Sequence, residues 1–220
     1  MTEAKVGVLS QIEQLKAENS NLIFSPAALE YLKKFDAGET DGITCWRDID
    51  IERKQGSSIQ GVGLFAKADI EANHVIAIKP GRVVSEGTVR ENAEVIKGTH
   101  QQIGQNSFLA GLTPEEVDNN LVGYNHSCDP NAKVVVIKDM PLAFLVSKKP
   151  IEKGGEITTD YSVSFTSNTQ EILACKCGSE NCRHHVQPGE NWKNDKFQHE
   201  HFDDFPGYIK ELIKESQPKN

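Results

Sequence analysis

Residues 125 to 131 read Asn-His-Ser-Cys-Asp-Pro-Asn, and this stretch decides the fold. Asn, Ser and Asp side chains hydrogen-bond to nearby backbone groups and proline stiffens the chain, so the composition favours a turn over a helix or a strand. One thiol, that of Cys128, lies inside this turn. A turn built in this way is suited to holding a ligand.

A second group of thiols lies near the C-terminus. Cys175, Cys177 and Cys182 form the pattern Cys-x-Cys-x4-Cys, whose Cys-x-Cys part is too tight for a comfortable disulfide within the segment. Together with Cys128 they supply four thiolates, which suit a tetrahedral structural zinc ion. Such a site would hold the C-terminal segment against the turn at 125–131. The alternative is a set of free thiols.

Other candidate ligands fit this site less well. His184 and His185 directly follow Cys182 and are possible substitutes, although surface positions suit them better. Cys45 is interpreted as a small buried apolar residue beside Trp46. An odd number of cysteines suits a reducing compartment, so we expect a soluble, intracellular protein of the cytoplasm or nucleus.

Two further motifs complete a recognisable set. Gly-Val-Gly-Leu-Phe-Ala occupies residues 61 to 66, and Gly-Glu-Ile-Thr-Thr-Asp-Tyr occupies residues 155 to 161. With residues 125 to 131 and the cysteine-rich residues 175 to 183, these motifs resemble the signatures of SET-domain lysine methyltransferases with a post-SET zinc module. Four motifs in the family's order make chance agreement much rarer than a single motif would.

The resemblance implies a fold and a domain organisation. The expected fold is mainly β with α, a SET-type β-clip of small sheets with a knot-like crossing and helical extensions at both ends. The expected parts are a helical N-terminal extension at 1–40, a SET domain at 41–172 with an insertion at 86–122, and a post-SET zinc segment with the C-terminal tail at 173–220.

The resemblance also implies S-adenosylmethionine as cofactor. The residues that it assigns to cofactor binding are Gly61, Val62, Gly63, Tyr124, Asn125, His126 and Tyr161. Glycine at a strand start is costly unless the backbone bends or a ligand approaches closely, although paired glycines alone more often mark a bulge. The chain departs from the family at Gly123, where an arginine is common, and at Gly155, where an acidic residue is usual.

Tyr161 is the catalytic residue that the resemblance implies. Methyl transfer to an amine needs a neutral nitrogen aligned with the methyl group, so the site must desolvate the lysine and lower its pKa. A tyrosine hydroxyl can orient that amine by hydrogen bonding. The sequence leaves open whether Tyr161 acts as a base or only as an orienting group.

Composition and charge exclude some partners. A net charge of -8 and a pI near 5.4 oppose a broad basic surface for nucleic acid, and we expect no direct binding to it. No apolar run approaches the ~18 residues of a membrane span, so no membrane partner is expected. The expected partner is a lysine-bearing protein or peptide. The acidity favours a basic segment, or it merely keeps the protein soluble.

Periodicity predicts the secondary structure in outline. Helices are expected over 5–18 and 26–35, with Ser25 as N-cap and Pro26 in the first turn, and Thr113-Pro114 marks another helix start. Short strands are expected over 46–51, 63–66, 75–78 and 82–84, then a hairpin of 133–137 and 143–147, then 157–161. The aromatic tail after 188 either docks on the core as a helix or covers the cofactor face.

Three functions remain open at this level. The first is transfer of methyl from S-adenosylmethionine to a lysine ε-amine of a protein. The second keeps the fold but uses a free amino acid or another small amine as acceptor. The third is a catalytically inactive, zinc-containing interaction domain, against which the presence of Gly61 to Gly63 and Tyr161 speaks.

Overall fold

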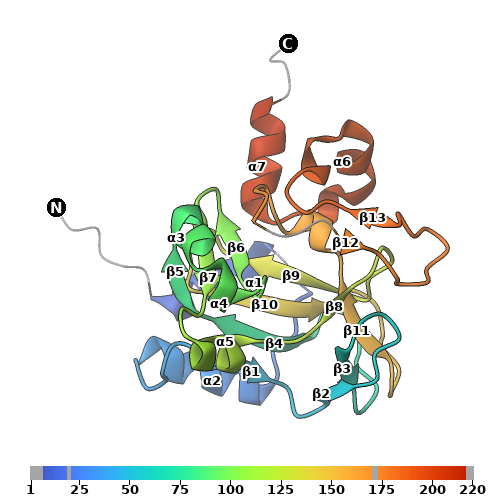
Figure 1. Cartoon of the computed structure of the whole chain (residues 1–220). Helices are drawn as coiled ribbons and strands as arrows, with labels where there is room; N and C mark the ends of the chain where they lie inside the picture. Colours follow the sequence, from blue (N-terminus) through green and yellow to red (C-terminus); the bar gives the residue numbers. More distant parts are fainter. Residues whose placement is uncertain (1–6, 19–20, 170–172, 217–220) are drawn as a thin grey trace.

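The computed structural model describes residues 7–18, 21–169 and 173–216, and it consists of small sheets with helices at both ends (Figure 1). Within these residues, no helix combines the length and the apolar character needed to cross a membrane. The mixed architecture of small sheets and terminal helices confirms the predicted fold class.

Two four-stranded sheets form the centre of the molecule. The first has the order β1-β4-β10-β9, with β1 (Trp46–Arg47), β4 (Val75–Pro80), β10 (Leu142–Ser147) and β9 (Ala132–Val136). The second has the order β2-β3-β11-β8, with β2 (Ile51–Gln55), β3 (Val62–Ala66), β11 (Glu156–Thr159) and β8 (Asn125–His126). Because β11 pairs antiparallel with β3 and parallel with β8, three of the sequence motifs lie side by side.

The first sheet contains two fully buried strands. Every residue of β4 and β10 is buried, as their nearly continuous apolar sequences predict. The predicted hairpin of β9 and β10 is confirmed, and its connection passes through Asp139 with a φ of 59°.

Two strand predictions were wrong at their boundaries. The single strand expected over 46–51 is divided between β1 and β2, because Asp48 forms a turn in which its carbonyl oxygen accepts from the Ile51 N–H at 3.2 Å. The strand expected over 157–161 ends at Thr159. There the Asp160 side chain caps a short 3₁₀ helix, η1 (Tyr161–Val163), by accepting from the Ser162 N–H at 2.9 Å.

The two predicted N-terminal helices are confirmed as α1 (Val8–Glu18) and α2 (Pro26–Asp36). Residues 5–6 of the first prediction lie outside the described residues. The Ser25 hydroxyl caps α2 by accepting from the Ala28 N–H at 3.2 Å. Both helices pack on the first sheet through an apolar cluster that includes Leu32 and Phe144.

The segment predicted as an insertion builds a third sheet of its own. It contains α3 (Glu86–Glu91), α4 (Ala93–Ile96), β6 (Gln101–Gly104), β7 (Ser107–Ala110) and α5 (Pro114–Asn120). Strands β6 and β7 were not foreseen, and they pair in the order β5-β7-β6 with β5 (Arg82–Val84). The predicted start of α5 is confirmed, with the Thr113 hydroxyl accepting from the Glu116 N–H.

The C-terminal segment docks on the core. Its elements are β12 (Leu173–Ala174), β13 (His185–Val186), η2 (Asn191–Lys193), α6 (Asp195–His201), η3 (Phe202–Asp204) and α7 (Gly207–Ser216). Phe197, Tyr208 and Ile213 are buried in the main apolar cluster. Their burial agrees with the prediction that the aromatic tail docks on the core. The Lys148 ammonium also pairs with the Asp204 carboxylate at 2.6 Å. Of the two predicted roles for the tail, docking on the core is confirmed.

Candidate active site and metal centre

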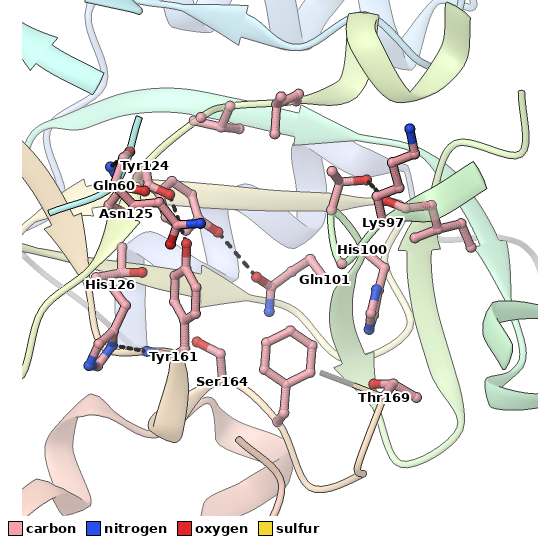
Figure 2. Close-up of a pocket in the computed structure, with 18 of the residues that line it drawn as sticks. Gln60, Lys97, His100, Gln101, Tyr124, Asn125, His126, Tyr161, Ser164 and Thr169 are labelled. Atoms are coloured by element: carbon pink, nitrogen blue, oxygen red, sulfur yellow. Dashed lines mark hydrogen bonds between the residues drawn. The ribbon is translucent and has the colours of Figure 1, made fainter. Parts of the chain in front are cut away.

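A cavity of about 1180 Å³ lies between the second sheet, the insertion and the segment that leads into the tail (Figure 2). The residues predicted to bind cofactor that line it are Gly61, Val62, Tyr124, Asn125, His126 and Tyr161. Cys175, one of the predicted metal ligands, also reaches its wall. The cysteine cluster and the cavity therefore share a boundary.

Gly63 does not belong to the described lining of the cavity, and its role is close packing. A Cβ atom at this position would lie 2.6 Å from Glu156 Oε1 and 2.9 Å from the Phe65 ring. Gly61, which does line the cavity, has a φ of 46° that L side chains rarely adopt. The two glycines thus shape this wall in different ways.

Asn125 holds residues 61–63, called the glycine loop below, in place. Its Nδ2 lies 3.0 Å from the Val62 carbonyl oxygen and 2.8 Å from Glu156 Oε1. The Ser57 hydroxyl donates to the same Glu156 oxygen at 2.7 Å. Because its amide hydrogens are used in this way, the Asn125 side chain positions the wall of the cavity.

Tyr161 presents its hydroxyl group to the cavity next to Tyr124. The hydroxyl donates to the Tyr124 carbonyl oxygen at 2.9 Å, and the ring centroid lies 5.4 Å from that of His126 (Figure 2). Burial raises the pKa of Tyr161 well above its ordinary value, and the nearby Glu156 carboxylate adds to the shift. The side chain is therefore a neutral phenol whose oxygen lone pairs can accept hydrogen bonds.

The opposite wall contains residues that the sequence did not single out. The Tyr124 hydroxyl donates to Gln101 Oε1 at 3.4 Å, and His100 and Lys79 line the same cavity. The sequence offered one signal for Lys79, because this residue directly continues the apolar run 75–78. In the structure its side chain is buried. His100 and Gln101 come from the insertion and carry no such signal.

His126 connects Tyr161 to the cysteine turn. Its Nδ1 accepts from the Tyr161 N–H at 3.2 Å, and its Nε2 lies 3.4 Å from Cys128 Sγ. Burial lowers the pKa of His126 to about 4, although Asp160 opposes the shift. The ring is thus neutral, and its 3.6 Å approach to the Asp160 carboxylate is not an ion pair.

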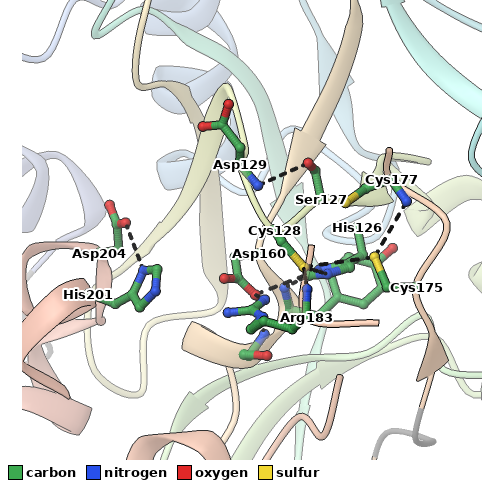
Figure 3. A network of polar contacts seen from close by, with 12 residues as sticks. His126, Ser127, Cys128, Asp129, Asp160, Cys175, Cys177, Arg183, His201 and Asp204 are labelled. Carbon is green, nitrogen blue, oxygen red and sulfur yellow. Dashed lines mark hydrogen bonds and ion pairs between the residues drawn. The ribbon is translucent and has the colours of Figure 1, made fainter. Parts of the chain in front are cut away.

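The structure brings the four predicted metal ligands together (Figure 3). The sulfur atoms of Cys128, Cys175, Cys177 and Cys182 all lie within 4.8 Å of one another. The distance between Cys128 Sγ and Cys175 Sγ is 3.8 Å. This matches the edge of a tetrahedron with ~2.3 Å metal–sulfur bonds, which is roughly 3.8 Å, and far exceeds the ~2.05 Å of a disulfide. The donor set therefore fits zinc.

The remaining cysteine and histidines stand outside this cluster. Cys45 is 7% exposed and lies in the main apolar core, as predicted. His184 and His185 are exposed, and neither belongs to the group of clustered ligands. Burial opposes ionisation of Cys177, but hydrogen bonds from the Cys128 backbone and Ser179 outweigh it and lower the pKa of this thiol to about 5.

Arg183 was not predicted as a site residue, yet it connects the cysteine cluster to the residue before Tyr161. Its backbone N–H donates to Cys128 Sγ at 3.4 Å, and its guanidinium donates to Asp160 Oδ1 at 2.7 Å (Figure 3). The guanidinium also lies 5.2 Å from the centroid of the Phe197 ring. One residue thus contacts the turn through its backbone, and the residue before Tyr161 and the tail through its side chain.

Comparisons with known proteins agree with this geometry. Residues 61–162 match the family model described as SET domain. The chain is similar to Histone-lysine N-methyltransferase 2D of Homo sapiens, with 30% identity over 135 residues that cover 58% of this chain and 2% of that protein. It is similar to Probable histone-lysine N-methyltransferase set-23 of Caenorhabditis briggsae, with 28% identity over 140 residues that cover 59% of this chain and 58% of that protein. It is also similar to Histone-lysine N-methyltransferase, H3 lysine-36 specific, of Yarrowia lipolytica, with 33% identity over 131 residues that cover 56% of this chain and 16% of that protein.

The matched part is the part that builds the site. The chain spans a small share of the first relative and a little over half of the second. Residues 61–162 match the SET domain model, the relatives named above are lysine methyltransferases by name, and the four clustered cysteines that include Cys175, Cys177 and Cys182 after that domain are consistent with a post-SET zinc site.

Proposed function

We propose that this SET-domain chain transfers a methyl group from S-adenosylmethionine to the ε-amine of a lysine in a protein. The observation that carries the proposal is the position of Tyr161, whose hydroxyl is held by the Tyr124 carbonyl on the wall of a cavity that the glycine loop and the cysteine cluster also border. The printed names of the relatives concern histone lysines. We propose that this chain also methylates lysine, but we do not propose that its substrate is a histone.

The cofactor would occupy the part of the cavity nearest the glycine loop. Gly61, Val62, Asn125 and His126 would border that part, and residues 174–176 also line the cavity. S-adenosylmethionine would supply an electrophilic methyl group on a sulfonium. The residues of the chain need only bind and orient the reactants and exclude water from them.

The cavity wall is suited to keeping an amine neutral. A lysine must lose its proton before it can act as a nucleophile, and burial in a poorly solvated site lowers its pKa. The wall already has this effect on its own lysine, since burial lowers the pKa of Lys79 to about 7. The Tyr161 oxygen accepts a hydrogen bond from the incoming amine, while its own proton is donated to the Tyr124 carbonyl. Tyr161 acts in this proposal as an orienting group.

We further propose that Cys128, Cys175, Cys177 and Cys182 hold one zinc ion. Four thiolates at this spacing repel one another strongly unless a cation binds between them. The ion would fix the post-SET segment, taken as residues 173–220, against the SET domain, taken as 41–172 with an insertion at 86–122. A reducing, intracellular compartment keeps such thiols available for metal.

Label transfer tests the proposed function. Metal-replete protein is incubated with methyl-labelled S-adenosylmethionine and, separately, with histones, a whole-cell lysate, and free lysine. Label in a lysine of a protein band is the expected result. Label in free lysine alone would move the function to small amines, and absence of label together with absence of cofactor binding by calorimetry would refute the enzyme.

A further inference from the structure

The cavity is lined by more cations than anions. Its charged lining consists of Lys79, Arg90, Lys97 and Lys176 against one carboxylate, Glu94. Arg90 is neutralised by Glu86, with a shortest distance of 2.5 Å between their charged atoms. Among the described residues, the ammonium groups of Lys97 and Lys176 have no ion-pair or hydrogen-bond partner. The wall therefore carries positive charge that this part of the chain does not compensate.

Two buried groups in the same wall also lack suitable partners. The Lys79 ammonium donates to the Asn120 carbonyl oxygen at 2.9 Å and to its side chain, which are both neutral acceptors. His100 is 4% exposed, and neither of its ring nitrogens has a partner in the described structure. A buried amine without a counter-charge and an unpartnered imidazole both cost stability until a ligand compensates them.

His100 and Lys97 come from the insertion and lie beyond Gln101 from Tyr161 (Figure 2). Tyr161 contacts the Tyr124 carbonyl, and the Tyr124 hydroxyl contacts Gln101, which directly follows His100. Gln60, which directly precedes the glycine loop where the cofactor is proposed to bind, lies on the opposite side of Gln101 from Lys97 (Figure 2). The cationic end is therefore available to the acceptor.

We propose that the methyl acceptor presents a carboxylate to this cationic end, close to its target lysine, and that Lys97 determines this preference. The inference rests on the methyltransferase function proposed above and names its substrate class. The carboxylate belongs either to an acidic residue flanking the lysine in a protein or to a free amino-acid acceptor. The net charge of -8 favoured a basic segment, but the local charge of the cavity opposes one.

Peptide binding tests the proposal without requiring turnover. Three fluorescent peptides of equal length carry one central lysine flanked on both sides by Glu, by Gln or by Arg. Their anisotropy is measured with the full, zinc-replete chain and the demethylated cofactor present. The Glu-flanked peptide should bind most tightly, by about threefold for each carboxylate at low salt, and Lys97→Glu should reverse the order.

Lys33→Glu is the matched control, because Lys33 is exposed on α2, does not belong to the described lining, and gives the same change in net charge. It should leave the order unchanged. The proposal is overturned if the Arg-flanked peptide binds wild-type protein as tightly as the Glu-flanked one, or if Lys33→Glu and Lys97→Glu change the order equally.

Competition identifies the source of the carboxylate. If free lysine displaces the Glu-flanked peptide and lysinamide does not, the carboxylate comes from a free amino acid. If neither displaces it, the flanking residues supply the carboxylate. Label transfer to the same peptides separates the two proposals. If no methyl label is transferred while the Glu-flanked peptide still binds most tightly, the methyltransferase is refuted and the anion site stands. If label is transferred but the affinity order of the peptides is reversed, the anion site alone is refuted.

Discussion

Replacing Tyr161 by Phe removes one hydroxyl and keeps the ring between Tyr124 and His126, whose centroids lie 6.2 Å and 5.4 Å away. The lost hydrogen bond to the Tyr124 carbonyl is a net contribution of about 0.5–1.5 kcal/mol to folding. The same hydroxyl positions the amine, and misplacement of a reacting group costs about 100-fold in rate, or roughly 2.7 kcal/mol of barrier. Turnover should therefore fall far more than stability.

The measurements are kcat from label transfer, the urea midpoint of unfolding, and cofactor affinity by calorimetry. Tyr208→Phe is a matched control, because the Tyr208 hydroxyl is also buried and donates to a backbone carbonyl, that of Ser164, at 3.3 Å. Tyr208 does not belong to the described lining of the cavity. Both variants should lose similar stability while only Tyr161→Phe loses turnover. Equal turnover in the two variants would show that Tyr161 is a packing residue.

Three further changes have definite expected outcomes. Cys128→Ser should lower bound zinc below about one ion per chain and weaken cofactor binding, whereas Cys45→Ser should spare both, as metal analysis and calorimetry will show. Burial raises the pKa of Asp204, but hydrogen bonds with His201 and Lys148 outweigh burial and hold this pKa at about 2, below its ordinary 3.8. The ionised Asp204 therefore stabilises the fold fully above pH 3.8, and this stabilisation is lost as the pH falls through 2. Asp204→Asn should therefore lower the urea midpoint at neutral pH and have little effect at pH ~2. Gly63→Ala should cost about 1–3 kcal/mol of stability by displacing Glu156, and Gly207→Ala, where nothing lies within 4 Å of the added carbon, should cost much less.

The residues that the sequence placed best are those whose own side-chain chemistry or close sequence neighbours indicate their role. Cys128 and the three later cysteines were assigned from spacing and thiol chemistry, and their sulfur atoms meet in space. Cys45 was separated from them by its apolar context, and it lies in the core. The capped helices at Ser25 and Thr113 were also found, because a cap is read within four residues.

The parts that sequence reasoning missed depend on distant partners. Gln102 is fully buried in β6, and its side chain is satisfied by Thr166, which lies 64 positions away. Nothing local distinguishes such a glutamine from a surface residue, so the β6–β7 hairpin was read as a polar, mixed segment. Tyr161 was placed on a strand although the signal against it was local, since the Asp160 side chain that ends β11 accepts from the Ser162 N–H two residues on.

The Arg183–Asp160 ion pair explains why metal and activity should be coupled. Arg183 directly follows the proposed metal ligand Cys182, and Asp160 directly precedes Tyr161, so the 2.7 Å contact between them joins the two sites. His126 forms a second connection, from the Tyr161 N–H to Cys128 Sγ. The Asp160 side chain is 2% exposed, and removing Arg183 would leave its charge buried without a partner. Loss of the metal would release Cys182 and with it Arg183, so the backbone at Tyr161 should shift before the main apolar core, which these residues do not build, begins to unfold.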